Sequence, residues 1–244
     1  MTAAGTGTVD LTGSRPPGRV VRLATEPEPI RVDLARSALL VIDMSNDCAH
    51  PEGWAGVYGG DIRPAAGLVA PIAATSAALR GAGARVIWVN WAVRSDAANL
   101  PAGLRRAYRR AGGGGLGAPV AGRGHPAMGR GGWGARVLDA LPVGAADIVV
   151  GKHRVSGFFD TELDGVLRAQ DIGVLFFAGV NTDQCVLATL VDAACLGYEC
   201  VLLTDCTATT SPGYCRRAAL HNVRECYGHL GLGRDLRAAI GGEP

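Results

Sequence analysis

Long apolar runs are absent from this sequence of 244 residues. No window of about 18 consecutive apolar residues occurs, so no segment predicts a transmembrane helix. Residues 1–29 also lack an apolar core behind a basic start, which is the pattern of a secretory signal. We therefore expect a soluble, cytoplasmic protein that does not act at a membrane.

Concentrated positive charge is absent as well. The net charge is only +2, and the arginines are dispersed along the chain. Proteins that bind nucleic acids need clustered basic side chains to neutralise phosphates. The sequence therefore gives no reason to expect a nucleic-acid partner.

Disulfide and metal-binding spacings are also missing. The seven cysteines are an odd number without repeated CxxC spacing, which argues against a disulfide framework and against a zinc ribbon. The five histidines show no ligand spacing; they stand at positions 50, 125, 153, 221 and 229. We expect no metal ion and no cofactor, and we expect most cysteines to be reduced and buried.

The sequence does contain an alternation of strand and helix patterns. Five short runs are apolar on both faces, as strands of a covered parallel sheet are; they occupy residues 37–43, 84–90, 147–150, 174–180 and 199–204. Helical patterns lie at 62–81, 133–140, 160–170, 183–196 and 212–227. This predicts the α/β class, with a single-domain, doubly wound, Rossmann-like fold over residues 31–240, whose mostly parallel sheet is flanked by helices.

Two stretches lack such patterns. Residues 1–30 are rich in Gly, Pro, Thr and Glu, and they predict a flexible or surface-wrapping arm without a catalytic role. Residues 92–132 form an insertion that is too rich in glycine for a stable element. A loop of this length acts as a lid, a binding loop or an interface element, or it is disordered, and the sequence leaves these alternatives open.

Three reactive side chains follow predicted strands. Asp43 ends the first strand, Lys152 follows the third, and Cys185 opens the helix after the fourth. Ligands of open α/β sheets bind beyond the carboxyl ends of the strands, where the strand order reverses. These residues are therefore the candidates for chemistry.

Their chemistry is mutually consistent. The positive end of a helix stabilises a thiolate, which predicts a lowered thiol pKa for Cys185. Asp43 is suited to accept the thiol proton, and the Lys152 ammonium favours both anions. Each residue also has a simpler interpretation: Cys185 as packing, Asp43 as a turn cap and Lys152 as a surface charge. The combination favours catalysis.

The chain resembles the isochorismatase-like cysteine hydrolases, which include nicotinamidases, N-carbamoylsarcosine amidohydrolases and ureidoacrylate amidohydrolases. The resemblance covers about residues 37–228, and its motifs are ALLVIDMSNDC, GARVIWVNW, GKHRVSGFFDTELDGVLRAQDI and GVNTDQCVLATLVDAACLGYECVLLTDCTATTSP. It implies the isochorismatase-like hydrolase fold and a catalytic triad of Asp43, Lys152 and Cys185.

The resemblance further implies a cis peptide between Val180 and Asn181. In the family this bond turns backbone amides toward the oxygen of a tetrahedral intermediate. The expected oxyanion hole is formed by the amides of Asn181 and Cys185.

The segment after the predicted lysine is most similar to the ureidoacrylate and carbamoyl-amide branch. This implies substrate contacts from Asn90 and Trp91 at the end of the second strand, and from Ser156, Gly157 and Phe158. Core packing is an equally open interpretation of Phe158.

The sequence also departs from these relatives. Val155 stands where ureidoacrylate amidohydrolases carry an aromatic residue, which leaves the substrate open. Nicotinamidases bind zinc near the end of the second strand, but that region reads WVNWAVRSD and contains no histidine. The resemblance therefore implies a metal-independent member of the superfamily.

The resulting functional prediction is an amidohydrolase. It would cleave the C–N bond of a small amide, ureido or lactam substrate through a thioester on Cys185, as a homodimer or homotetramer. Alternatives are a streptothricin-type lactam hydrolase, an isochorismate-type vinyl-ether hydrolase, against which Cys185 argues, and a catalytically silent scaffold, which would require the loss of a triad member.

Overall fold

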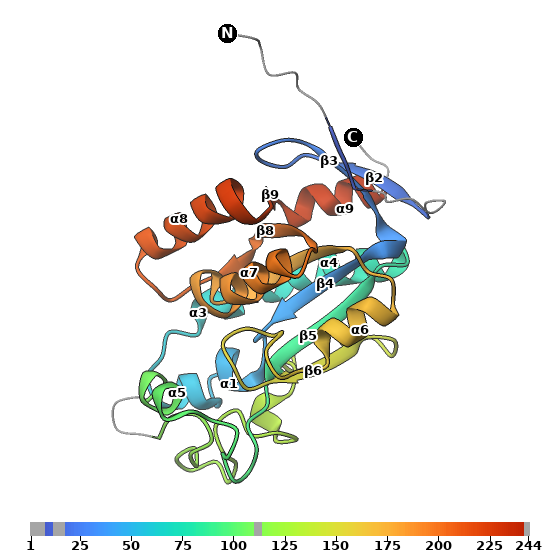
Figure 1. The fold of residues 1–244 in the computed structure, drawn as a ribbon. Helices are drawn as coiled ribbons and strands as arrows, with labels where there is room; N and C mark the ends of the chain where they lie inside the picture. Colours follow the sequence, from blue (N-terminus) through green and yellow to red (C-terminus); the bar gives the residue numbers. More distant parts are fainter. Residues whose placement is uncertain (1–7, 12–17, 110–113, 242–244) are drawn as a thin grey trace.

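The computed structural model describes residues 8–11, 18–109 and 114–241. Six parallel strands form the central sheet (Figure 1). In spatial order they are β6 (Ile148–Lys152), β5 (Arg85–Trp91), β4 (Ser37–Ile42), β7 (Val174–Val180), β8 (Glu199–Ala208) and β9 (His229–Gly231). The chain runs outward from β4 to β6 on one side, and from β7 to β9 on the other. The doubly wound α/β prediction is confirmed.

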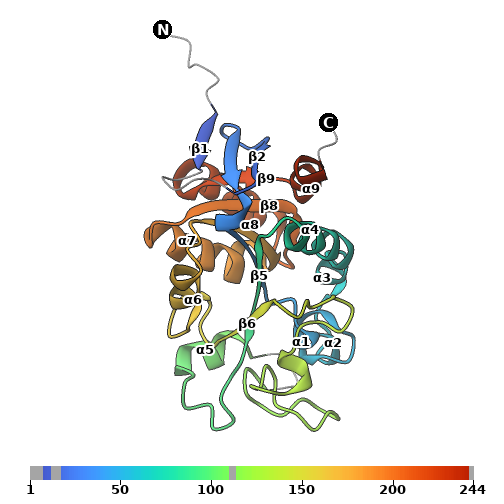
Figure 2. The ribbon, with the colours of Figure 1, turned by 90° about the vertical axis from the view of Figure 1, so that its right-hand side faces the viewer.

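Helices cover both faces of this sheet (Figure 2). One face carries α4 (Val69–Gly81) and α9 (Gly233–Gly241), and the other carries α6 (Leu163–Ala169) and α7 (Leu187–Cys195). Successive side chains of a strand point to opposite faces. Leu40 and Ile42 therefore pack in the core beneath α6 and α7, while Leu39 and Val41 pack beneath α4 and α9.

The predicted helices differ in detail from the observed ones. Residues 62–81 contain two helices, α3 (Arg63–Ala66) and α4. A π-helical turn, η3 (Thr182–Val186), precedes α7, and another, η4 (Val223–Tyr227), follows α8 (Gly213–Asn222). The structure adds β9 and α9, together with the short helices η1 (Leu34–Arg36), α1 (Asn46–Ala49) and α2 (Trp54–Val57).

The predicted helix over 133–140 is wrong. Only one 3-10 turn forms there, η2 (Trp133–Ala135). Beyond it, the Leu138 amide donates to the Met44 carbonyl at 2.8 Å, and the Asp139 amide donates to Asn46 Oδ1 at 3.0 Å. These amides bond to the segment after β4, so they are not available for an α-helical ladder.

Part of the predicted N-terminal arm has regular structure. Strands β1 (Val9–Leu11), β2 (Val20–Leu23) and β3 (Ile30–Asp33) form a small sheet in the order β1-β3-β2. Val21 and Leu23 are buried in the same cluster as Leu236 of α9. These strands bury apolar side chains against the domain, so this part of the predicted flexible or surface-wrapping arm packs on the surface of the fold. Residues 1–7 and 12–17 lie outside the described ranges.

The glycine-rich insertion is also more regular than expected. It contains helix α5 (Ala102–Ala107), and Leu116, Val120 and Met128 are buried in the core cluster beneath α6 and α7. These apolar anchors hold the described parts of residues 92–132 against the sheet end; residues 110–113 lie outside the described ranges. Within the described ranges, no helix has the length and apolarity to cross a membrane.

Asp147 is a buried carboxylate that connects three elements. It precedes β6 and accepts hydrogen bonds from the Arg80 guanidinium of α4 at 2.7 Å, from the Trp88 indole of β5 at 2.8 Å and from the Gly144 amide at 2.9 Å. Burial alone would raise the pKa of this carboxyl group, but the donors hold the pKa below its usual value.

We expect Asp147→Ala to lower the free energy of unfolding by about 3 kcal/mol at pH 7, because it leaves a partly buried guanidinium without its anion. The folded pKa of Asp147 lies below its ordinary value of 3.8. The carboxylate therefore stabilises the fold above that value, and its contribution is lost as the pH falls through the lower folded pKa. Denaturant titrations at pH 7 and pH 3 should show the difference from wild type shrinking at pH 3.

The matched control is Asp96→Ala, which removes an exposed ion pair with Arg94. We expect little change in its denaturation midpoint. Equal destabilisation by the two substitutions would contradict this account of Asp147.

Candidate active site

The structure brings the three predicted reactive residues together. Asp43 follows β4, Lys152 ends β6, and Cys185 lies in η3 after β7. Lys152 Nζ is 2.9 Å from Asp43 Oδ2 and donates to Cys185 Sγ at 3.4 Å. All three side chains are buried. The cluster sits where the strand order reverses, between β4 and β7.

The backbone fixes Asp43 in this place. Its φ of 53° lies in the left-handed region, which a non-glycine residue seldom adopts. The Asp43 amide donates to the Val89 carbonyl at 2.9 Å, and the Trp91 amide donates to Asp43 Oδ1 at 3.2 Å. The end of β5 therefore orients the carboxylate toward Lys152.

The Lys152 ammonium has three hydrogen-bonding partners. Besides Asp43 and Cys185, it donates to the Arg154 carbonyl at 3.2 Å. An ammonium carries three donors, so the set is complete. The same ammonium lies 3.8 Å from the centroid of the Trp91 ring, which adds a cation–π contact.

Burial controls the ionisation of the cluster. It raises the pKa of the Asp43 carboxyl group, although Lys152 opposes the shift. Burial alone would lower the pKa of Lys152, but Asp43 and Cys185 hold that pKa above its usual value. The ammonium therefore persists at neutral pH.

The pKa of the Cys185 thiol differs from the prediction made from the sequence. Burial raises the pKa of Cys185 to about 12; Lys152 opposes this shift, while Asp43 adds to it. The predicted lowering by the helix terminus is therefore wrong. A second buried anion beside Asp43 costs more than the single ammonium returns. The raised pKa values of Cys185 and Lys152 favour a thiol beside an ammonium at neutral pH.

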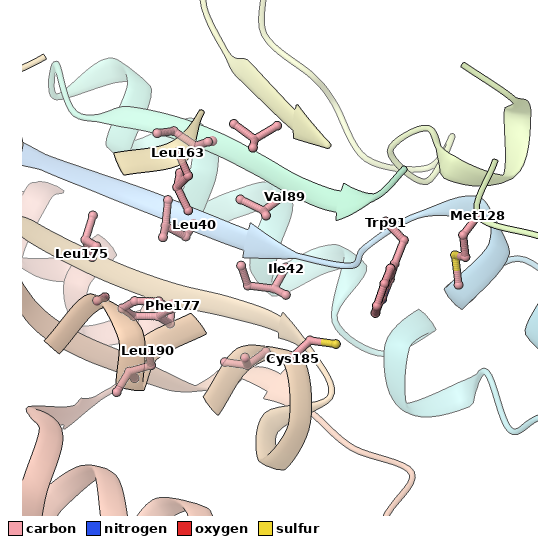
Figure 3. Close-up of a cluster of buried hydrophobic side chains, with 14 of the residues drawn as sticks. Leu40, Ile42, Val89, Trp91, Met128, Leu163, Leu175, Phe177, Cys185 and Leu190 are labelled. Atoms are coloured by element: carbon pink, nitrogen blue, oxygen red, sulfur yellow. The ribbon is translucent and has the colours of Figure 1, made fainter. Parts of the chain in front are cut away.

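A cavity of about 350 Å³ opens in front of the thiol; we call it the inner cavity. Asp43, Trp91, Asn181 and Cys185 line it. Figure 3 shows the Cys185 side chain beyond Ile42, the last residue of β4, with its sulfur pointing toward Trp91. The Val180–Asn181 peptide at its edge is cis, and Asn181 Nδ2 donates to Gln184 Oε1 at 3.2 Å.

A larger hollow of about 1080 Å³ adjoins the inner cavity; we call it the outer cleft. It lies between α5, the segment after β6, and α7. The two hollows share five lining residues: Trp54, Tyr108, Asn181, Gln184 and Thr210. The two hollows therefore border each other at these residues.

The predicted substrate residues divide into two groups. Trp91 lines the inner cavity and Ser156 lines the outer cleft, so both predicted substrate contacts face a hollow and stay predictions. Asn90 does not join them: strand alternation turns its side chain to the opposite face, where Nδ2 donates to the Ala135 carbonyl at 3.4 Å.

The residues after Ser156 serve mainly in packing. Phe158 packs on Tyr198, with ring centroids 5.9 Å apart, and lines neither hollow. Its neighbour Phe159 is 64% exposed and lines the outer cleft. The Gly157 amide donates to Thr189 Oγ1 at 3.0 Å, which fixes this segment to α7.

Sequence reasoning missed Tyr108. This residue follows α5 in the glycine-rich insertion, and its hydroxyl lies 4.0 Å from Cys185 Sγ. Its ring contacts Trp91 edge to face, with centroids 5.5 Å apart. Burial, with Cys185 and Asp43 nearby, raises the pKa of Tyr108, so the hydroxyl stays protonated. No spacing in the insertion pointed to this residue.

Asp47 was missed for a different reason. It lies in the motif around Asp43, but its role is to anchor neighbouring segments: it accepts from the Trp54 amide at 2.8 Å and from the Met128 amide at 2.6 Å. These bonds hold α2 and the insertion over the inner cavity. In the described part of the chain, no group of three or more His, Cys, Asp or Glu residues could hold a metal ion.

The fold and this cluster define a class of protein. Residues 37–233 match the family model of the isochorismatase domain, so the chain belongs to the isochorismatase family. The resemblance found in the sequence is confirmed.

Curated relatives and solved structures are similar to this chain over most of its length. The ureidoacrylate amidohydrolase RutB of Azorhizobium caulinodans is 35% identical over 229 residues, covering 89% of this chain and 96% of the relative. RutB of Methylobacterium radiotolerans is 34% identical over 232 residues, covering 91% and 86%. A solved cysteine hydrolase from Pseudomonas syringae pv. phaseolicola has the same fold, with a TM-score of 0.72 at 24% identity over 94% of this chain and 99% of that one.

The raised thiol pKa can be tested by alkylation. We expect the rate at which iodoacetamide modifies Cys185 to rise about tenfold per pH unit from pH 7 to pH 10, because the thiolate fraction grows at that rate below the pKa. Peptide mass spectrometry resolves Cys185 from the other six cysteines. A free cysteine peptide is the control, since its rate levels off above about pH 9. A Cys185 rate that is constant above pH 7 would indicate a resting thiolate and contradict this prediction.

Proposed function

We propose that the chain is an amidohydrolase that cleaves the C–N bond of a small amide or ureido substrate through a thioester on Cys185. The observation that carries the proposal is the contact of one buried ammonium with both a carboxylate and a thiol, at 2.9 Å and 3.4 Å. The RutB relatives, at 34% to 35% identity over most of the chain, support C–N hydrolysis as the reaction.

In this proposal Asp43 is the general base. Its carboxyl group and the Cys185 sulfur contact the same Lys152 ammonium, and its raised pKa brings its basicity closer to that of the thiol. A smaller difference in pKa lowers the cost of the proton transfer. Asp43 therefore removes the thiol proton as the sulfur attacks the substrate carbonyl, so the thiolate develops only during the reaction.

Lys152 stabilises negative charge on its two neighbours and does not give up its own proton. Its pKa is raised, so it remains an ammonium beside both partners. When the proton moves from Cys185 to Asp43, the negative charge moves from one neighbour of the ammonium to the other. Lys152 therefore stabilises the states before and after the transfer, without rearrangement of the site.

The backbone amides of Asn181 and Cys185 are the proposed oxyanion hole. Both residues line the inner cavity, beside the cis peptide. Asp43 then returns its proton to the departing nitrogen, and the thioester forms as the C–N bond breaks. A water molecule, deprotonated by Asp43, attacks the thioester, which releases the acid and restores the thiol.

The direct test is a substrate screen with detection of ammonia or amine. It covers primary amides, N-carbamoyl compounds, ureidoacrylate-type acids and lactams, and isochorismate tests the vinyl-ether alternative. Release of amine from at least one class supports the proposal. Hydrolysis of isochorismate alone would contradict it.

We expect Cys185→Ala to abolish turnover, because it removes the nucleophile. Asp43→Asn and Lys152→Ala should each lower kcat/KM by several orders of magnitude, because the three residues act as one unit. Steady-state kinetics on the best substrate of the screen measures the effects.

The matched control is Cys195→Ala, which alters an exposed cysteine at the end of α7. It should retain wild-type kcat/KM. Circular dichroism and thermal melts establish that each variant is folded. Retained turnover in a folded Cys185→Ala variant would rule out the thioester mechanism.

A further inference from the structure

We infer that the substrates carry an extended, neutral acyl group and a small leaving amine, with the acyl group in the outer cleft and the amine in the inner cavity. The inference rests on the proposed function and specifies its substrate class. It assigns to the outer cleft the part of the substrate that remains attached to Cys185 in the thioester.

The orientation follows from the position of Asp43. A general acid must come within hydrogen-bonding reach of the nitrogen that it protonates. Asp43 lines the inner cavity and does not line the outer cleft. The departing nitrogen therefore faces the inner cavity, and the other substituent of the carbonyl carbon points away from Asp43.

The available space then sets the size of each part. The inner cavity has about 350 Å³, about a third of the volume of the outer cleft, and must also hold the reacting carbonyl, so it is the tighter of the two spaces for the leaving amine. The outer cleft has about 1080 Å³ and begins at the same boundary, where Tyr108, Asn181 and Gln184 line both hollows. An acyl chain that passes Tyr108 enters the larger space.

The lining of the outer cleft sets the chemistry of the acyl group. Six apolar side chains come from α5, the segment after β6, and α7: Leu104, Ala107, Val155, Leu187, Ala188 and Val191. Among the described lining residues the charged ones are of both signs, Arg109 and Arg154 against Asp183 and Asp192. Apolar walls with balanced charge favour an aliphatic or aromatic acyl group over an anionic one.

The inner cavity excludes one kind of amine. Among its described lining residues the charged ones are acidic: Asp43, and Asp61, which pairs with the exposed Arg63 at 2.8 Å. The nearby Lys152 ammonium already has three partners. A leaving amine that carries a carboxylate would meet these carboxylates without a free cation among the described lining residues. The structure therefore favours a neutral amine.

Two matched series of amides test the assignment. In the first, the leaving group is ammonia and the acyl group grows from acetamide through butyramide and hexanamide to 3-phenylpropionamide. In the second, the acyl group is acetyl and the amine grows from methyl to hexyl. We expect kcat/KM to rise about tenfold or more along the first series and to fall along the second. A rise along the second series without one along the first would overturn the assignment.

A variant of the cleft wall provides an independent test. Val191 lies on α7, six residues after Cys185 in the sequence. We expect Val191→Trp to fill part of the outer cleft and to lower the ratio of kcat/KM for hexanamide to that for acetamide about tenfold. Cys195→Trp, at an exposed position of the same helix, should leave this ratio unchanged. An unchanged ratio in a folded Val191→Trp variant would contradict the role of the cleft.

These results separate the two proposals. If wild-type protein releases no amine from any amide or ureido compound, the proposed function itself fails. If amides are hydrolysed but kcat/KM does not depend on the length of the acyl group, the hydrolytic function stands and the assignment of the outer cleft fails.

Discussion

The site depends on one buried positive charge. Lys152 has no exposed surface, and removing an ammonium from water costs several kcal/mol. Every group around it offsets that cost: the Asp43 carboxylate, the Cys185 sulfur, the Arg154 carbonyl and the Trp91 ring. Burial raises the pKa of Cys185 and the neighbouring Asp43 adds to this shift, which favours a thiol over a thiolate at neutral pH. The proposed chemistry follows, since a single proton moves between Asp43 and Cys185 while the ammonium stays in place.

The sheet topology creates this cluster. Strands β6, β5, β4 and β7 are neighbours, and their carboxyl ends lead to Lys152, Trp91, Asp43 and Cys185 respectively. Trp91 and Lys152 are direct register partners, and the Trp91 amide also holds Asp43. Residues more than 100 positions apart are thus placed within hydrogen-bonding distance by strand order alone. The insertion is anchored by Asp47 and by buried apolar side chains, and its Tyr108 lines both the inner cavity and the outer cleft beside the thiol.

The sequence allowed the fold and the reactive cluster to be predicted, because buried strands with a polar residue at their end leave a strong local pattern. Other features depend on contacts between distant segments. The thiol pKa is set by burial and by the nearby Asp43, which outweigh the helix terminus. Tyr108 lies in a glycine-rich segment whose position is fixed by Met128 and other anchors. Asn90 and Trp91 were both predicted to contact substrate, yet strand alternation places their side chains on opposite faces of the sheet. Residues 133–140 have a helical pattern, but Asn46 and Met44 bind the amides that a helix would use.

The central claim is that the sulfur of Cys185 carries the acyl group during turnover. The most direct measurement is rapid acid quenching of the enzyme during hydrolysis of a good amide substrate, followed by mass spectrometry of the peptide that contains Cys185. The account predicts an adduct with the mass of the acyl group on this peptide, removable by hydroxylamine and present only while substrate remains. Single-turnover formation of acid, with no adduct at any time and at an unchanged rate in the Cys185→Ala variant, would contradict it.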